Sequence, residues 1–208
     1  MSLVKIEITP EQRAWGLWRI EEPEETLIAE TSPYESIPST IANQNKRLEF
    51  AAGRVLVKQV AESLNLAFHG IAKDEFGKPS LKQNTAQLSL SHSWPYVAAI
   101  VDRSEPVGID LEQPKGKLLR VAHRILNPVE LLDAGEDIVK HCIYWCAKET
   151  MVKIHGKKDL VFAKNLEIKP FEMKNEGNII GSIIVNNSST THNLKYSIKN
   201  EFVVVFNE

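Results

Sequence analysis

Hydrophobic positions recur along the chain in two periods, which separate expected strands from expected helices. Apolar and polar side chains alternate over residues 3–8 and 14–20, and this alternation predicts two strands. Over residues 41–66 the apolar side chains fall three and four apart, which is the spacing of one helix face. The helical spacing returns at residues 138–155, directly before Gly156, a residue type that commonly follows a helix. We therefore expect two long helices, one in each half of the chain.

Short apolar runs between and after these helices predict further strands. A hairpin is expected from residues 88–91 and 96–102, with His92-Ser-Trp-Pro at its bend and a strand at Val107–Glu112 after it. Asn127-Pro-Val-Glu130 has the composition of a helix start with a capping box. The C-terminal part is expected to be rich in strands, with a polar loop over residues 186–191. These strands cover residues 166–168, 179–185, 194–198 and 202–206.

The order of these elements repeats, because each half carries one long helix followed by a closing hairpin. A tandem pair of similar α/β units is expected to pack about a pseudo-twofold axis and to form a cleft. The fold prediction is therefore α+β, with an N-terminal half at residues 1–104 and a C-terminal half at residues 105–208.

Composition limits the function classes. The chain is 43% hydrophobic and 25% charged, with a net charge of −2, so bulk charge provides no basic field for nucleic acid or a membrane surface. No apolar run reaches the roughly 18 to 20 residues of a membrane span, and the first residues lack the order of a signal peptide. We expect a cytoplasmic protein. Cys142 and Cys146, four apart on one expected helix, are interpreted as small core residues.

Glu149 and Lys153 lie four apart on the second long helix, so they share one face. Helical projection places this pair toward the apolar side, near Cys142 and Cys146, and places Lys148 on an opposite polar arc. One interpretation is an ordinary exposed ion pair. The other is a metal or ligand site, because charges on an apolar face are costly unless they are paired or bound.

Two further charge pairs allow both a structural and a functional interpretation. Asp110 and Glu112 alternate along a strand and project from the same face, either as solubilising edge charges or as oxygen ligands for a divalent cation such as Mg²⁺. Arg47 and Arg54 are seven apart and share one side of the first long helix. They are either solvated or positioned to bind phosphate.

Four motifs in a fixed order together resemble the 4′-phosphopantetheinyl transferase superfamily, of the surfactin-synthetase-activating type with two similar halves in one chain. The resemblance runs from about residue 41 to 170, and it is the ordered set that makes it specific. The motifs are Gly77-Lys-Pro79, Leu90-Ser-His-Ser93, Val107-Gly-Ile-Asp-Leu-Glu112 and Trp145-x-x-Lys-Glu-x-x-x-Lys153.

The resemblance implies transfer of phosphopantetheine from coenzyme A to a carrier-protein serine, with release of adenosine 3′,5′-bisphosphate. It implies that Asp110, Glu112 and Glu149 hold Mg²⁺, and that Lys153 contacts the phosphates, with Lys148 as a second candidate. The serine would be deprotonated by Glu149 or by a metal-bound water. The remaining implied coenzyme A contacts are Arg47, Arg54, Lys78, Pro79, Ser91 and His92.

Several alternatives stay open. His92 could be a turn histidine bonded to backbone. The chain could bind coenzyme A or a nucleotide without transferring anything, or hydrolyse a diphosphate with a bound metal. The expected partners are coenzyme A and an apo acyl, peptidyl or polyketide carrier protein, for which residues 125–134 are a candidate docking surface. A monomer is expected, since both halves lie in one chain.

Overall fold

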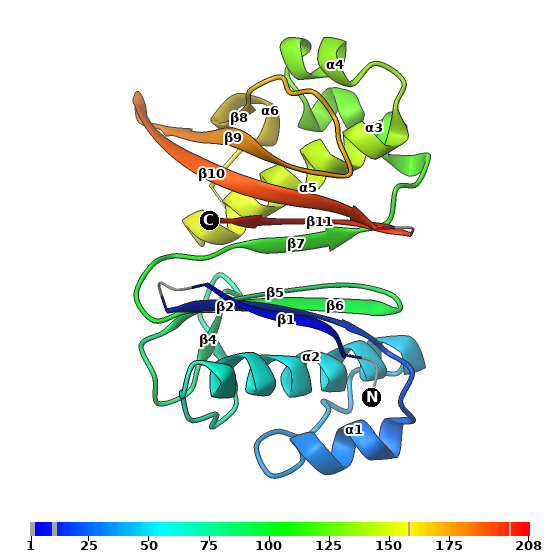
Figure 1. Cartoon of the computed structure of the whole chain (residues 1–208), viewed down its shortest axis with the longest axis vertical. Coiled ribbons are helices and arrows are strands. Elements are labelled where there is room, and N and C mark those ends of the chain that lie inside the picture. Colours follow the sequence, from blue (N-terminus) through cyan, green and yellow to red (C-terminus); the bar gives the residue numbers. More distant parts are fainter. Residues whose placement is uncertain (1–2, 10–11, 158, 200) are drawn as a thin grey trace. The chain divides into compact units, whose positions relative to one another are not determined.

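The strands of this protein form two antiparallel sheets, one in each half of the chain (Figure 1). The computed structural model describes residues 3–9, 12–157, 159–199 and 201–208. The chain divides into two compact units, Met1–Val107 (unit 1) and Gly108–Glu208 (unit 2), each with its own hydrophobic core. The predicted mixed α+β class is confirmed.

In unit 1, the long helix α2 (Gln44–Ser63) lies across one face of the sheet, and α1 (Glu24–Thr31) packs on α2 (Figure 1). The apolar stripe of α2 is buried in the core against the sheet, and Asn43 caps its N-terminus by accepting from the Lys46 amide. The strands are ordered β1-β2-β6-β5-β4-β3. They comprise β1 (Leu3–Thr9), β2 (Arg13–Arg19), β3 (Ile71–Lys73), β4 (Pro79–Leu81), β5 (Gln87–Ser93) and β6 (Tyr96–Asp102).

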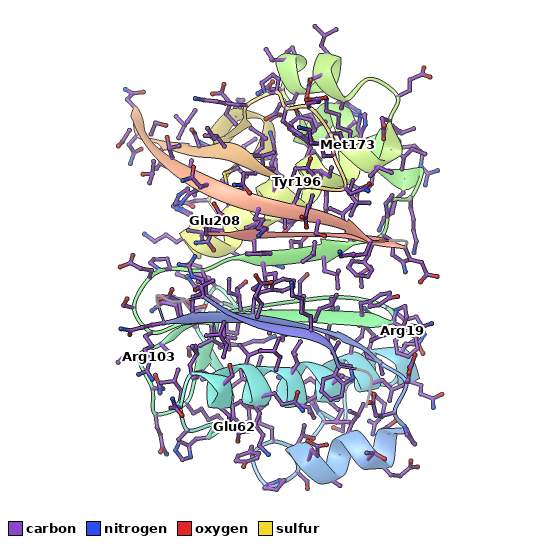
Figure 2. All side chains as sticks on the ribbon, viewed as in Figure 1. Arg19, Glu62, Arg103, Met173, Tyr196 and Glu208 are labelled. Carbon is purple, nitrogen blue, oxygen red and sulfur yellow. The ribbon has the colours of Figure 1, made fainter. Side chains whose placement is uncertain are left out.

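In unit 2, the long helix α5 (Ile138–His155) packs on the sheet with one side and on α3 and α4 with another (Figure 1). The strands are ordered β7-β11-β10-β9-β8. Figure 2 shows the side chains that fill the space between sheet and helices in each unit. The other elements of unit 2 are β7 (Ile109–Glu112), α3 (Lys117–Ile125), α4 (Pro128–Ala134), α6 (Phe162–Asn165), β8 (Leu166–Ile168), β9 (Glu176–Val185), β10 (Ser188–Lys199) and β11 (Phe202–Asn207).

The two sheets share a connectivity around their long helices. In unit 1 the strand before the helices, β2, pairs with the last strand β6, and the sheet continues through β5, β4 and β3. In unit 2 the strand before the helices, β7, pairs with the last strand β11, and the sheet continues through β10, β9 and β8. This shared order supports the prediction of two similar halves, while the pseudo-twofold axis itself stays a prediction.

The ends of α5 follow the local rules of its sequence. The Asp137 side chain caps the N-terminus by accepting from the amides of Val139 and Lys140. Gly156 ends the helix at a φ of +76°, a left-handed conformation that favours glycine. The predicted helix over residues 138–155 is confirmed, as are the buried positions of Cys142 and Cys146.

Other local predictions were wrong. Glu24 and Glu25 form the acidic first turn of α1, a helix that was not predicted, and their charges suit the positive end of the helix dipole. His92 lies within β5 and not at the bend, which is formed by Trp94 and Pro95. The expected polar loop at residues 186–191 is a two-residue turn, because Asn186 and Asn187 both have positive φ and β10 begins at Ser188.

Within the described residues, we find no helix with the length and apolar character needed to cross a membrane.

Candidate active site

Strand β7 and helix α5 bring four charged side chains of unit 2 together, and we call them the carboxylate site. Asp110 and Glu112 come from β7, and Glu149 and Lys153 come from α5. The Lys153 ammonium donates to the Ile109 carbonyl at 2.7 Å and to Asp110 Oδ1 at 2.8 Å. The prediction that Glu149 and Lys153 face the packed side of the helix is therefore supported by direct contact between α5 and β7.

A glycine makes this approach possible. A Cβ added to Gly108 would lie 2.2 Å from the Thr150 carbonyl oxygen on α5, which is well inside van der Waals contact. Any side chain at position 108 would therefore push the start of β7 away from α5. Alternation along β7 then places Asp110 and Glu112 on one face of the strand.

The carboxylate site carries more negative than positive charge. The pKa of Glu149 is raised to about 7, chiefly by burial and also by the charges of Asp110 and Glu112, while Lys153 opposes the shift. Lys117 lies 3.5 Å from Glu112 and offsets part of the charge at the rim. A bound cation would relieve the remaining repulsion among the three carboxylates.

The donor chemistry of this site fits a hard divalent cation. Carboxylate oxygens are the ligands that Mg²⁺ prefers. The pKa of Glu149 is raised because Lys153 does not offset burial and the neighbouring negative charges. Among the described side chains, no group of three or more His, Cys, Asp or Glu is already arranged around a single ion position. Asp110 instead bonds Lys153. The residues present thus supply suitable ligands, with Lys153 bound to one of them.

Lys148 does not lie on an outer polar arc, so that prediction was wrong. Its side chain is fully buried, and its ammonium pairs with the equally buried Glu130 at 2.6 Å. Burial lowers the pKa of Lys148, and Glu130 opposes this shift. The arc is covered because α3, α4 and α6 pack over it. The ammonium also donates to the carbonyls of Ile125, Phe162 and Leu166.

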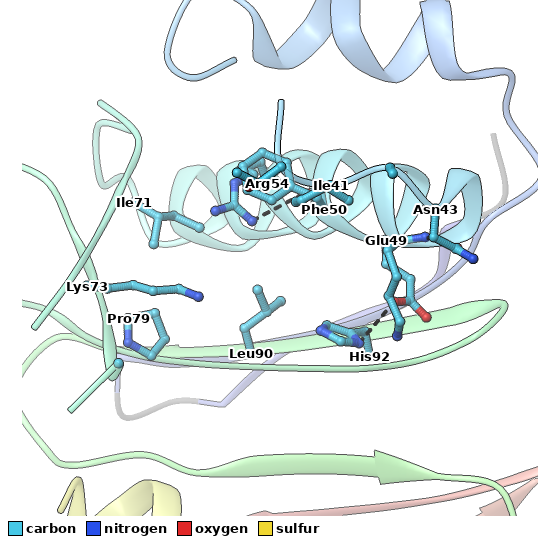
Figure 3. Close-up of a pocket in the computed structure, with 14 residues that line it drawn as sticks. Ile41, Asn43, Glu49, Phe50, Arg54, Ile71, Lys73, Pro79, Leu90 and His92 are labelled. Carbon is cyan, nitrogen blue, oxygen red and sulfur yellow. Dashed lines mark hydrogen bonds and ion pairs between the residues drawn. The ribbon is translucent and has the colours of Figure 1, made fainter. Parts of the chain in front are cut away.

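Unit 1 contains a separate cavity of about 560 Å³, which we call the basic pocket (Figure 3). Its cationic lining residues are Lys46 and Arg54 from α2 and Lys73 from β3, and His92 from β5 also lines it. Arg54 lies over the Phe50 ring and donates to Glu35 at 2.9 Å. Burial lowers the pKa of Arg54, which Glu35 opposes.

A family model matches the second half of the chain. Residues 106–205 match the family described as the 4′-phosphopantetheinyl transferase superfamily. This part of the chain is similar to members of that superfamily. Two relatives from Bacillus subtilis are similar over 114 residues: 4′-phosphopantetheinyl transferase ffp at 33% identity and 4′-phosphopantetheinyl transferase Sfp of strain 168 at 32%.

The similarity to these transferases is partial. Each alignment covers 50% of this chain and 50% of the relative, so the chain spans about half the length of the curated relatives it matches. A third B. subtilis 4′-phosphopantetheinyl transferase is 32% identical over 91 residues, which is 40% of this chain and 39% of that protein. The superfamily region contains the whole carboxylate site, whereas the basic pocket lies before it.

The structure brings some of the expected coenzyme A contacts into the basic pocket. Arg54, Pro79 and His92 line it. Arg47 does not line it, because its guanidinium donates to Glu24 at 2.8 Å. Two more expected contacts, Ser91 and Lys78, are not among the lining residues. Ser91 is buried in β5, and the Lys78 amide donates to the Asp74 side chain.

Three charged residues of the basic pocket were not expected from sequence: Lys46, Glu49 and Lys73. Lys46 and Glu49 are three apart on α2, a spacing typical of an exposed ion pair. Only the packing of β5 against α2 shows that Glu49 is buried.

Proposed function

We propose that this chain transfers the 4′-phosphopantetheine group of coenzyme A to a serine of an apo acyl, peptidyl or polyketide carrier protein, releasing adenosine 3′,5′-bisphosphate. The observation that carries the proposal is the meeting of Asp110, Glu112, Glu149 and Lys153 within the superfamily region. The names of the relatives, each a 4′-phosphopantetheinyl transferase, support the reaction class.

In this proposal, Asp110, Glu112 and Glu149 hold Mg²⁺. When bound, Mg²⁺ supplies positive charge that stabilises the diphosphate as its bond to the leaving group breaks. Lys153 donates to phosphate oxygens, and its position is set by bonds to Ile109 and Asp110.

The carrier serine is the nucleophile. Its oxygen forms a bond to the phosphorus that carries pantetheine, and the bond from that phosphorus to adenosine 3′,5′-bisphosphate breaks. We assign the serine proton to Glu149, which is the carboxylate of α5 that faces both acidic residues of β7.

The basic pocket of unit 1 binds the nucleotide end of coenzyme A. Its volume of about 560 Å³ is within the range of small-molecule sites. Arg54 and His92 contact phosphate, and Pro79 lines the adenosine. Arg47, Lys78 and Ser91 stay predicted contacts. Lys148 has a structural role in this proposal, because its fully buried ammonium pairs with Glu130 and donates to three carbonyls.

A second candidate function is binding of coenzyme A or a nucleotide without transfer. The location of the basic pocket favours it, because that pocket lies outside residues 106–205 and uses none of the carboxylates of unit 2.

Intact-mass spectrometry separates the two. Apo carrier proteins are incubated with coenzyme A, Mg²⁺ and one of three proteins: wild type, Glu149→Gln or Glu62→Gln. Glu62→Gln is the control, because it makes the same change at an exposed position of α2. We expect a phosphopantetheine-sized mass gain with wild type and the control, and none with Glu149→Gln or with a chelator. Full activity of Glu149→Gln contradicts the assigned site. Unmodified carriers together with retained coenzyme A binding favour the second candidate.

We further propose that the carrier docks on α4, where apolar side chains face solvent. Leu132 is 86% exposed and Val129, three residues earlier on the helix, is 58% exposed. Leu132→Glu is expected to lower kcat/KM for the carrier about tenfold while coenzyme A affinity stays unchanged, because the side chain contributes little to the core. An unchanged kcat/KM would place the docking surface elsewhere.

A further inference from the structure

Glu49 is a buried carboxylate in a pocket whose other charged lining groups are cationic. Its side chain projects from α2 and is 2% exposed. Figure 3 shows it pointing toward His92 at one side of the pocket. Burying a carboxylate is costly unless other groups compensate it. A pocket built only to attract an anion would not need this charge.

The two oxygens of Glu49 differ in their contacts. Oε2 lies 3.2 Å from Nδ1 of His92 and accepts from the Lys46 ammonium at 2.6 Å. Oε1 is also buried, and it has no hydrogen-bond partner among the described residues. Buried polar atoms in native proteins are nearly always satisfied. The open oxygen is therefore unexpected for a carboxylate that serves stability alone, and it indicates a contact that forms when the pocket is filled.

We propose that Glu49 is a positioning residue for nucleotide binding. Its Oε2 holds His92 through Nδ1, so that the other ring nitrogen, Nε2, is presented to the ligand in one fixed orientation. A hydrogen bond at one imidazole nitrogen sets the role of the other. The same oxygen holds the Lys46 ammonium at the pocket edge. This inference rests on the proposed function, which assigns His92 to a phosphate of coenzyme A.

A role of Glu49 through its charge alone predicts the opposite change in affinity. The direction in which Glu49→Gln changes nucleotide affinity therefore distinguishes the two roles. If Glu49 acted only through its charge, replacing it with glutamine would remove repulsion and tighten the binding of an anion. If Glu49 positions His92 and Lys46, the same change releases both side chains from their positions and weakens binding. Loss of a group that orients a metal-binding histidine costs about 10-fold to 100-fold in metal affinity, and we expect an effect of similar size here.

The experiment is calorimetric titration of the full chain with adenosine 3′,5′-bisphosphate. The proteins are wild type, Glu49→Gln, His92→Ala and the double variant, with Glu62→Gln as the matched control. We expect Glu49→Gln and His92→Ala each to weaken binding about tenfold or more. Glu49→Gln should cause a smaller loss in the His92→Ala background than in wild type, because only the part that acts through Lys46 remains, and the control should bind like wild type.

Glu49→Asp covers the case in which Glu49→Gln fails to fold. Aspartate keeps the charge but withdraws the carboxylate from His92, so it too should weaken binding, whereas the charge-only account expects no change. Circular dichroism and the melting temperature check that each variant is folded.

Binding by Glu49→Gln that equals or exceeds wild type would overturn the inference. An equal loss from Glu49→Gln with and without His92 would overturn it as well, because the effect would not pass through that ring. If wild type transfers phosphopantetheine but the expected losses of nucleotide affinity are not observed, only the inference about Glu49 is wrong. If wild type neither binds the nucleotide nor modifies a carrier, the proposed function fails and the inference falls with it.

Discussion

At the residue scale, Gly108 controls how closely β7 approaches α5. Gly108→Ala places a Cβ 2.2 Å from the Thr150 carbonyl oxygen, so backbone must shift. We expect the free energy of unfolding, measured by urea denaturation, to fall by about 1–3 kcal/mol. Gly116→Ala is the control, because a Cβ there meets nothing within 4 Å. Equal stability of the two variants would show that the start of β7 adapts without cost.

Asp102 is a second single residue with a testable role. Burial would raise its pKa, but the amides of Ser104 and Glu105 and the Arg13 guanidinium outweigh burial and hold the pKa below its ordinary value. A lowered folded-state pKa contributes stability above the unfolded value of about 3.9, and this contribution is lost as pH falls through the folded value.

We therefore expect Asp102→Asn to lower the free energy of unfolding by about 1–3 kcal/mol at pH 7. The difference from wild type should shrink below about pH 4, because wild-type Asp102 then becomes neutral as well. Urea denaturation at several pH values measures this. Glu105→Gln, an exposed neighbour, serves as the control. A difference that does not depend on pH would contradict the assigned role of the charge.

Individual residues also show the limit of sequence reasoning. The inward face of Glu149 and Lys153 could be predicted, because it follows from helical spacing alone. Lys148 could not be placed, because its partners are Glu130 and three carbonyls supplied by other elements. Glu49 was missed for the same reason, since its burial depends on a distant strand.

At the element scale, the buried pair of Glu130 and Lys148 joins α4 to α5. Glu130 also completes the capping box of α4 at the Asn127 amide and accepts from the Ile168 amide of β8 at 2.7 Å. The Asn-Pro-Val-Glu motif, interpreted from sequence as a helix start, is confirmed. The structure adds that the same carboxylate compensates a buried lysine.

Lys148→Ala should leave Glu130 buried without its cation and lower the free energy of unfolding by about 3–5 kcal/mol. The exposed Lys157→Ala should change it by less than about 0.5 kcal/mol. The double variant Glu130→Gln/Lys148→Ala should lose less than the sum of the single changes, because neither charge is then left unpaired. Additive losses, measured by chemical denaturation, would show that the two residues act separately.

Long elements with strong periodicity were predicted well, and short ones were not. Helix α5 was predicted with its observed ends because its apolar period and the glycine that follows it, Gly156, agree. Helix α6 and strands β3 and β4, of three or four residues each, were missed, as was the nine-residue helix α3. Elements of three or four residues contain too few positions to show a period, so their state depends on the elements against which they pack.

At the scale of the whole molecule, the groups proposed for nucleotide binding and for metal binding belong to different units. The basic pocket is built from unit 1 and the carboxylate site from unit 2. A chelator should therefore abolish carrier modification but change the affinity for adenosine 3′,5′-bisphosphate by less than about threefold. Calorimetry and intact-mass spectrometry on the same sample measure both. Loss of nucleotide binding with the chelator would contradict this division.

The sequence by itself determined the α+β class, the two long helices, the capping of α4 and α5 and the resemblance to the superfamily. These features depend on spacing and on local hydrogen bonds, which a chain carries before it folds. Tertiary structure alone decided that Lys148 and Glu49 are buried and which groups compensate them. Lys148 with Glu130 and Glu49 with His92 are pairs formed by packing between separate elements. Their burial depends on neighbours far along the chain, so no local pattern could predict it.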